Sequence, residues 1–458
     1  SINYFHKLHQ LFVAIKDRIM VEDLDEISFE DIENNDDAEI VLSSKIVTDA
    51  ADPDFFSLVR RINKHSLDLQ PNFQRGYVWD NAKASRLIES ILLGIPLPTI
   101  YLAEEMDGKQ VVIDGQQRLT AVKKFMQNEF KLKGMQSFPE LNKKTFGDLP
   151  KDKQETIENS SIRTITFKKE SDEDLKFAIF ERLNTGSVPL NDMELRNCIY
   201  RGPYIELLKD LANYDEFRKL IGIKTADKRM KDVELVLRFA ALYHSTYLNY
   251  EAPIKTFLNK DAKKYQNISD DDCKNLCNAF YNSVRIINSV FGDKAFKRFY
   301  RGNSEDTAGY WEQKKFNVSL FDALMFAFRD KDQNMVMRTK DLIREAIINL
   351  MTMDETFIDS ISRSTSSKEP LQYRCETVDR LIKNILATTT KQQRCFSLEF
   401  KQKLFDENPT CAICGNRIEN IDDAAVDHIE QFWQGGQTTE ENGRLTHRYC
   451  NNARKRKE

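Results

Sequence analysis

Apolar and polar residues follow two different periods along this chain, and the period changes near residue 190. Upstream, short runs rich in β-branched residues alternate with stretches of helical spacing, which is typical of a mixed α/β domain. The runs 99–103 and 110–113 flank an Asp107-Gly108 turn and predict a β-hairpin. Further elements are expected as a strand at 161–167 and helices at 55–63, 80–92, 119–126 and 171–183. Asp80 is expected to cap the second of these helices, and Ser171 with Asp174 resembles a capping box that opens the fourth. From 190 to 385 helical spacing is almost continuous and predicts an all-α bundle.

These patterns predict a multidomain α+β protein with four parts. The expected parts are an N-terminal helix with an acidic arm at 1–43, an α/β domain at 44–189, an all-α helical domain at 190–390 and a small ββα module at 396–458. The arm carries acidic residues from Glu22 to Glu39 and no Lys or Arg. Such a segment is usually a solvated arm, and the alternative is a DNA-mimicking segment that covers a basic site.

Composition narrows the function classes. At 458 residues the chain is too long for a single core, and its net charge of -4 excludes a uniformly basic nucleic-acid binder. Any nucleic-acid surface must therefore be a local patch. No apolar run reaches membrane-spanning length, so no membrane partner is expected. Five of the eight cysteines share no spacing, which favours a reduced, cytoplasmic compartment.

The C-terminal module carries two pairs of metal-ligand residues. Cys411-x-x-Cys414 is followed, after a 32-residue gap, by His447-x-x-Cys450. Four nitrogen and sulfur ligands in two such pairs suit tetrahedral Zn²⁺, and a closed site of this kind is structural. The alternatives are a redox Cys-x-x-Cys and unrelated buried cysteines. A redox motif would not need the distant pair, so a zinc site is predicted.

An Asp-His dipeptide lies between the two ligand pairs. Val426 and Ile429 flank it, which predicts a short strand ending in Asp427-His428. A final helix is expected over 446–457 and would carry His447, Cys450 and Asn451. Hydrolysis of a phosphodiester needs a general base for water and a divalent cation at the scissile phosphate. His428 can be the base, and Asp427 with Asn451 can supply hard oxygen ligands for Mg²⁺ or Mn²⁺.

The ordered set from Cys411 to Asn451 resembles the HNH nuclease superfamily in its zinc-bound form, over residues 405–457. The resemblance implies that Asp427 binds the catalytic metal, that His428 activates water and that Asn451 is a second metal ligand. It also implies that Asn442 orients the strand that carries the base. The chain departs from the family pattern at His447, where the third zinc ligand is usually cysteine, and at Glu430, where proline is usual.

Basic residues follow the second ligand pair and predict a phosphate-binding edge without sequence readout. The expected DNA-binding residues are Arg444, Arg448, Arg454, Lys455 and Arg456. The alternative is an ordinary charged terminus.

A second motif, Asp114-Gly115-Gln116-Gln117-Arg118, follows a predicted strand and opens a predicted helix. Amide groups at a helix N-terminus favour an anion, and Gly115 lets the backbone approach it closely. Arg118 can add a fork-shaped phosphate ligand, and Asp114 can hold a metal or polarise water. On its own, Asp-Gly is also a common turn.

This motif resembles the ParB/sulfiredoxin-like domain of GmrSD-type proteins when it is taken together with the Phe73-Gln74-Arg75 segment and the Phe180–Gly186 segment, over residues 45–200. These relatives are nucleoside-triphosphate-hydrolysing parts of modification-dependent (type IV) restriction systems and related defence proteins. The resemblance implies a nucleotide site in which Asp114 is also catalytic. Its expected residues are Gln74, Arg75, Asp114, Gly115, Gln116, Gln117, Arg118, Thr120, Arg182 and Asn184.

Two unrelated catalytic motif sets in one chain predict an NTP-regulated DNA endonuclease of an anti-phage restriction system. The expected cofactors are Zn²⁺, Mg²⁺ or Mn²⁺ and an NTP, and the expected DNA is phage or modified DNA. Homo-oligomerisation stays open. The rival hypotheses are a nucleotide-switched DNA-binding protein with a non-cleaving HNH module and an HNH effector that cleaves RNA.

Overall fold

The computed structural model describes residues 28–29, 46–69, 79–105, 107–171, 173–183, 190–302, 308–363, 365–388, 396–431 and 436–454. Contacts divide the chain into two compact units, which are described separately. One contains residues 38–205 with 228–231, and the other contains 1–37, 206–227 and 232–458. The predicted N-terminal helix and all of the acidic arm except Ser28–Phe29 lie outside the described residues. No helix in the described ranges is long and apolar enough to cross a membrane.

The first unit is built on a five-stranded mixed sheet with the strand order β2-β6-β4-β5-β3. Its strands are β2 (Thr48–Ala51), β3 (Leu67–Asp68), β4 (Ile100–Glu104), β5 (Gln110–Asp114) and β6 (Thr164–Phe167). β4 and β5 pair antiparallel, as the hairpin prediction required, whereas β4 pairs parallel with β6. The edge strands β2 and β3 were not predicted, because they have only four and two residues and no clear alternation.

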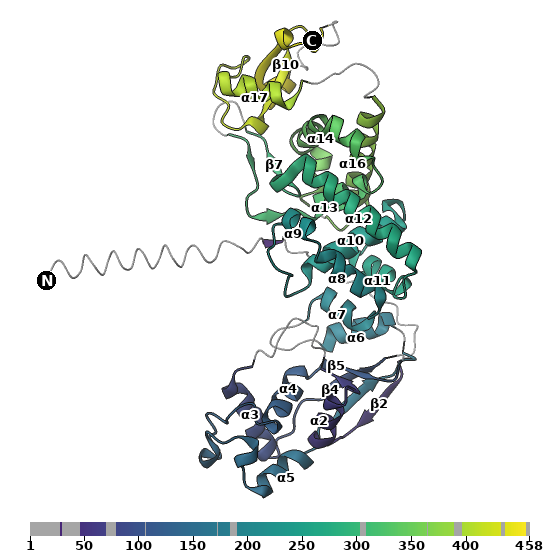
Figure 1. The fold of residues 1–458 in the computed structure, drawn as a ribbon, viewed down its shortest axis with the longest axis vertical. Coiled ribbons are helices and arrows are strands. Elements are labelled where there is room, and N and C mark those ends of the chain that lie inside the picture. The colour runs from purple at the N-terminus through teal and green to yellow at the C-terminus, as the bar shows by residue number, and fades with distance from the viewer. Residues whose placement is uncertain are drawn as a thin grey trace, which may run out of the picture. The chain divides into compact units, whose positions relative to one another are not determined.

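Helices pack around this sheet or against one another. They are α2 (Phe55–Asn63), α3 (Asn81–Leu92), α4 (Gln116–Met126) and α5 (Lys151–Asn159), followed by α6 (Glu173–Leu183) and α7 (Asp192–Ile199), which pack together. Figure 1 shows α2 to α5 beside β4 and β5, and one core joins Ile88, Val122 and Ile157 to Leu102 of the sheet. Asp80 caps α3 as predicted, since its carboxylate accepts from the Lys83 amide at 2.7 Å.

The middle of the chain is mainly helical but not all-α. Its helices are α8 (Pro203–Ala212), α9 (Asp215–Ile221), α10 (Lys231–Ser245), α11 (Ile254–Lys264), α12 (Asp270–Phe291), α13 (Val318–Phe328), α14 (Gln333–Met353), α15 (Glu355–Ser360) and α16 (Lys368–Thr388). A buried carboxylate joins three of them, because Asp322 of α13 accepts from Arg238 of α10 and Arg374 of α16. All three side chains are at most 4% exposed.

Three short strands correct the all-α prediction. β7 (Phe299–Tyr300) pairs antiparallel with β8 (Tyr310–Trp311), and β9 (Lys315–Phe316) pairs parallel with β1 (Ser28–Phe29). Two-residue strands show no alternation that a sequence pattern could reveal. Cross-strand aromatic pairs hold the β7–β8 ribbon, since the Phe299 and Trp311 rings lie 5.1 Å apart and Tyr300 stacks on Tyr310 at 5.0 Å.

The C-terminal module has the predicted ββα order. It comprises α17 (Leu398–Glu407), the antiparallel pair β10 (Ala424–His428) and β11 (Gly443–His447), and α18 (Arg448–Arg454). Its apolar core is small and includes Cys411, Ile418, Ala424, Leu445 and Cys450. A core of this size makes additional stabilisation, such as a bound metal, physically reasonable.

Candidate functional site

The four predicted zinc ligands converge in the C-terminal module. The donor atoms of Cys411, Cys414, His447 and Cys450 all lie within 4.8 Å of one another, and only Cys414 is exposed. Cys411 and Cys414 lie on a tight turn. The Gly415 amide donates a hydrogen bond to the Cys411 carbonyl at 2.9 Å and closes this turn. The prediction placed His447 on the final helix, but it is the last residue of β11 and the helix begins at Arg448.

The hydrogen bonds of His447 identify the nitrogen that faces the cysteines. Nδ1 lies 3.4 Å from Sγ of Cys414, and Nε2 lies 3.2 Å from the carbonyl oxygen of Arg417. A carbonyl can only accept, so the proton belongs on Nε2 and the Nδ1 lone pair points at the sulfur atoms. A metal-binding histidine usually has a partner of this kind on its second nitrogen.

The cysteine environment favours a cation. Burial alone would raise the pKa of Cys411, but the amides of Cys414, His447 and Ile413 outweigh it and lower that pKa to about 7. Burial and the neighbouring sulfur atoms of Cys411 and Cys414 raise the pKa of Cys450 to about 12. A divalent cation would relieve the repulsion among these thiolates. Three sulfur donors and one imidazole nitrogen are consistent with zinc.

Asp427 and His428 occupy the last two positions of β10. Nε2 of His428 lies 3.0 Å from the Thr438 hydroxyl, and the Phe396 ring lies 4.6 Å from the imidazole, so both groups help to set the ring orientation. Asp427 is buried and pairs with Arg444, directly opposite on β11, at 2.8 Å. The sequence did not single out Thr438 or Phe396, because neither has a distinctive spacing from His428.

Asn442 holds the loop after His428 in place. Its Oδ1 accepts from the Glu430 amide at 2.8 Å, and its Nδ2 donates to the carbonyls of Glu430 and Gln437 at 3.1 and 2.8 Å. The backbone of Gly436 passes so close that an added Cβ would lie 1.9 Å from the Glu430 oxygen. Glu430, which stands where the resemblance expects proline, therefore enters this loop through its backbone groups.

The predicted DNA-binding residues have different environments. Arg448 is 1% exposed and its guanidinium contacts protein groups, so this prediction is corrected: Arg448 is an internal structural residue. Arg444 is partly exposed and pairs with Asp427. Asn451 is half-buried on α18, directly after Cys450. The Arg454 side chain, Lys455 and Arg456 lie outside the part of the chain that is described.

The Asp-Gly-Gln-Gln-Arg motif joins β5 to α4 as predicted. Gly115 has a φ of +101°, and an added Cβ would lie 2.1 Å from Ile100, so the turn requires glycine. Arg118 differs from the expectation. Its guanidinium donates to the Pro98 carbonyl, to the Thr99 carbonyl at 3.3 Å and to Asp114 at 3.0 Å. Arg118 thus holds the segment before β4, while the Asp114 side chain remains 43% exposed.

The other predicted nucleotide-site residues are only partly visible. Gln116, Gln117 and Thr120 are half-exposed near the start of α4, and Arg182 is exposed near the end of α6. Gln74, Arg75 and Asn184 lie outside the described residues. The structure therefore brings Asp114 and Arg118 into direct contact and leaves the remainder of the predicted pocket as a prediction.

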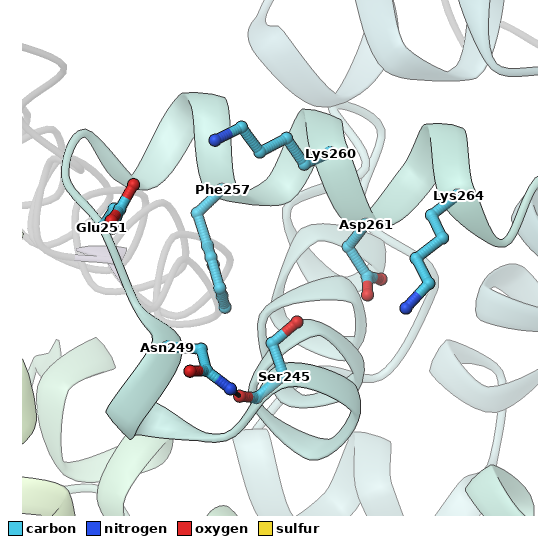
Figure 2. Close-up of a pocket in the computed structure, with 7 residues that line it drawn as sticks. All are labelled: Ser245, Asn249, Glu251, Phe257, Lys260, Asp261 and Lys264. Carbon is cyan, nitrogen blue, oxygen red and sulfur yellow. Dashed lines mark hydrogen bonds between the residues drawn. The ribbon is translucent and has the colours of Figure 1, made fainter.

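A small pocket lies elsewhere, in the helical domain between α11 and the end of α10 (Figure 2). Its volume is about 120 Å³. The Phe257 ring and the buried Asp261 carboxylate line it, with Lys260 and Lys264 also on α11. Asp261 is hydrogen-bonded to Nδ1 of His244 at 2.9 Å. None of these residues was singled out by the sequence.

Comparison with known families agrees with the predicted order of the two domains. Residues 55–201 match the family described as GmrSD restriction endonuclease, N-terminal domain, and residues 411–457 match the HNH endonuclease family. The chain thus has the GmrSD-type N-terminal domain followed by an HNH endonuclease domain. No curated protein matches the chain. The two domains together support a nuclease of a restriction-type system with DNA as its substrate.

Proposed function

We propose that the protein is an NTP-regulated, metal-dependent DNA endonuclease of an anti-phage restriction system that acts on phage or modified DNA. The observation that carries this proposal is the placement of Asp427 and His428 at the end of β10, beside the Asn442-clamped loop and in the same hairpin as the Cys/His cluster. This is a base and a carboxylate on a small scaffold, which is the minimum for metal-assisted hydrolysis.

His428 is the general base in this proposal. Thr438 and Phe396 orient its imidazole, so that one ring nitrogen can accept a proton from an attacking water. Asp427 and Asn451 offer the oxygen ligands that Mg²⁺ or Mn²⁺ prefers. When bound, that cation would polarise the scissile phosphate and stabilise the leaving oxygen. Asn442 acts indirectly, by holding the backbone that follows His428.

The Cys/His cluster is proposed to hold a structural Zn²⁺. Cys411 and Cys414 come from a turn, whereas His447 and Cys450 come from β11 and α18. One ion would join the three segments and leave no open position for substrate. Its role is then to stabilise the module and not to react.

The N-terminal domain is proposed to bind and hydrolyse an NTP and so to control cleavage. Its supporting feature is the glycine turn at the start of α4, where helix amides favour an anion. Arg118 enters this proposal as the residue that holds the turn, because its guanidinium contacts backbone carbonyls and Asp114. Asp114, at the exposed end of that pair, is the residue proposed to meet a metal-bound nucleotide.

The test uses full-length wild type, His428→Ala and Asp114→Ala with modified phage DNA, unmodified DNA and RNA, in the presence of Mg²⁺ and each NTP. Cleavage of modified DNA that needs His428 and responds to NTP through Asp114 is expected. Digestion that does not depend on His428, or no cleavage of any DNA, overturns the proposal. Cleavage confined to RNA supports the ribonuclease alternative, and NTP-dependent DNA binding without cleavage supports the switch alternative.

A further inference from the structure

The HNH module is fastened to the helical domain through charged side chains that are mostly buried. Arg448, the first residue of α18, is 1% exposed. Its Nη2 donates to Glu345 of α14 at 2.6 Å, its Nη1 to Asn349 of α14 at 2.8 Å, and its Nε to the Asp422 carbonyl at 2.6 Å. One guanidinium therefore ties the start of α18 both to α14 and to the segment before β10.

Glu345 is the centre of this network. It also accepts from Lys401 of α17 at 2.8 Å, and Lys401 lies 3.3 Å from the carbonyl of Ala424, the first residue of β10. Burial would raise the pKa of Glu345, but Arg448 and Lys401 outweigh it and hold that pKa below its ordinary value. The carboxylate is thus ionised between two cations that come from the module.

A second set of contacts holds the segment before β10. Both oxygens of Asp422 lie 3.0 Å from Nη2 of Arg344, and Oδ2 also accepts from the Trp311 indole at 2.6 Å. Asp423 accepts from the Gly309 amide at 3.1 Å, and an added Cβ at Gly309 would lie 2.7 Å from its carboxyl carbon. Through Gly309 and Trp311, the β7–β8 ribbon and its loop therefore contact the module directly.

These contacts lie at the start of β10 and at the start of α18, and the candidate catalytic residues lie further along both elements. Asp422 and Asp423 directly precede β10, whose last residues are Asp427 and His428, and Arg448 begins the helix that carries Asn451. Asp427 and His428 themselves contact Arg444, Thr438 and Phe396. The attachment therefore holds the start of both elements that carry the candidate catalytic residues.

We propose that Arg344, Glu345 and Asn349 of α14 are positioning residues for the nuclease, which set the placement of β10 and α18 through Asp422 and Arg448. The proposal rests on the proposed nuclease function. Ion pairs of this kind add little net stability but restrict geometry strongly when every member is paired. Because misplacing a catalytic group by about 1 Å can cost on the order of a hundredfold in rate, such a restriction is functionally useful.

The experiment compares full-length wild type with Glu345→Gln and with Arg344→Gln. The control is Asp341→Asn, one helical turn before Glu345 on α14 and outside this set of contacts. We measure zinc content, hydrogen exchange of segments 421–428 and 448–454, and kcat and KM on DNA. Glu345→Gln and Arg344→Gln should retain zinc, exchange faster in both segments and lose about tenfold or more in kcat with KM little changed. Asp341→Asn should resemble wild type.

The outcomes separate this proposal from the proposed function. Three results would overturn the positioning role. They are unchanged hydrogen exchange in both variants, faster exchange with unchanged kcat, and increased cleavage. If wild type cleaves nothing, the nuclease function fails, whereas exchange still decides whether α14 holds the module. If Glu345→Gln loses zinc or unfolds, a double-mutant cycle of Arg344→Gln and Asp422→Asn decides instead. Because these two residues act through one ion pair, the double variant should lose no more kcat than the worse single variant.

Discussion

Arg444 donates two hydrogen bonds to the same oxygen of Asp427, from Nε at 3.1 Å and from Nη2 at 2.8 Å. The two residues are direct cross-strand partners on β10 and β11. The guanidinium therefore neutralises the carboxylate that is proposed to bind the catalytic metal. A divalent cation at Asp427 has to compete with this pairing.

Replacing Arg444 should consequently tighten metal binding while it slows cleavage. In Arg444→Gln the competing cation is gone, so the dissociation constant for Mn²⁺ measured by calorimetry without DNA should fall by about threefold to tenfold. Cleavage should weaken, because a phosphate-binding cation is also lost. Arg444→Lys keeps the charge and should stay near wild type in metal affinity. Weaker Mn²⁺ binding in Arg444→Gln would contradict the competition.

Removing one cluster cysteine should destabilise the module. Wild type should contain about one zinc ion per chain by elemental analysis, because four ligands form one tetrahedral site. Cys411→Ser should lose that zinc and melt the C-terminal module at a lower temperature than the rest of the chain. Cys273→Ser, on α12 and outside the cluster, is the matched control. Full zinc content in Cys411→Ser would refute the ligand assignment.

Thr438 should matter through His428. Thr438→Val removes the hydroxyl that lies 3.0 Å from Nε2 of His428. The imidazole loses one of its orienting contacts, so kcat should fall by about tenfold while KM and zinc content stay unchanged. A Thr438→Ser variant, which keeps the hydroxyl, should retain most of the activity; if Ser and Val behave alike, the hydrogen bond is not the cause.

Gly436 should tolerate no side chain. In Gly436→Ala the new Cβ would lie 1.9 Å from the Glu430 oxygen and 3.0 Å from Nδ2 of Asn442, so the loop after His428 must move. Cleavage should fall by about tenfold or more, with zinc retained, because catalytic groups need close positioning. Gly147→Ala, where φ is not left-handed and the added carbon would lie 3.3 Å from the Asn128 side chain, serves as a control for glycine replacement outside the module. Wild-type activity in Gly436→Ala would show that the loop does not position His428.

The attachment to α14 should weaken in acid. Arg448 and Lys401 hold the pKa of Glu345 below its ordinary 4.5 against the effect of burial, and Arg344 with Trp311 similarly lowers the pKa of Asp422 below 3.8. Each carboxyl group has a lower pKa in the folded protein than in the unfolded chain. Its ionised form therefore stabilises the folded protein fully at pH values above the unfolded pKa, and this stabilisation is lost as pH falls through the folded pKa. The difference in unfolding temperature between wild type and Glu345→Gln should therefore be constant near neutrality and shrink below about pH 4. A difference that grows in acid would contradict the sign.

Much of the first unit follows from local pattern. The β4–β5 hairpin, α3 with its Asp80 cap and the glycine turn before α4 all depend on neighbouring residues, so the sequence predicts them. Ser171 shows the limit. It was expected to open α6 in a capping box with Asp174, but its hydroxyl exchanges hydrogen bonds with the backbone of Val47, 124 residues away. A local pattern cannot predict a partner at that separation.

By itself, the sequence determined which chemistry is present. Cysteine and histidine spacing indicated the metal cluster, and the Asp-His dipeptide with Asn442 indicated the hydrolytic site, because the order and the chemistry of these groups are written in the residue types. Tertiary structure alone decided which of the predicted phosphate ligands bond instead to the protein itself. Arg448 and Arg118 read as phosphate ligands in the sequence, yet one is buried against Glu345 and the other donates to the backbone before β4. A guanidinium binds a phosphate, a carboxylate or a carbonyl with the same N–H groups, so only the fold determines which of these it meets.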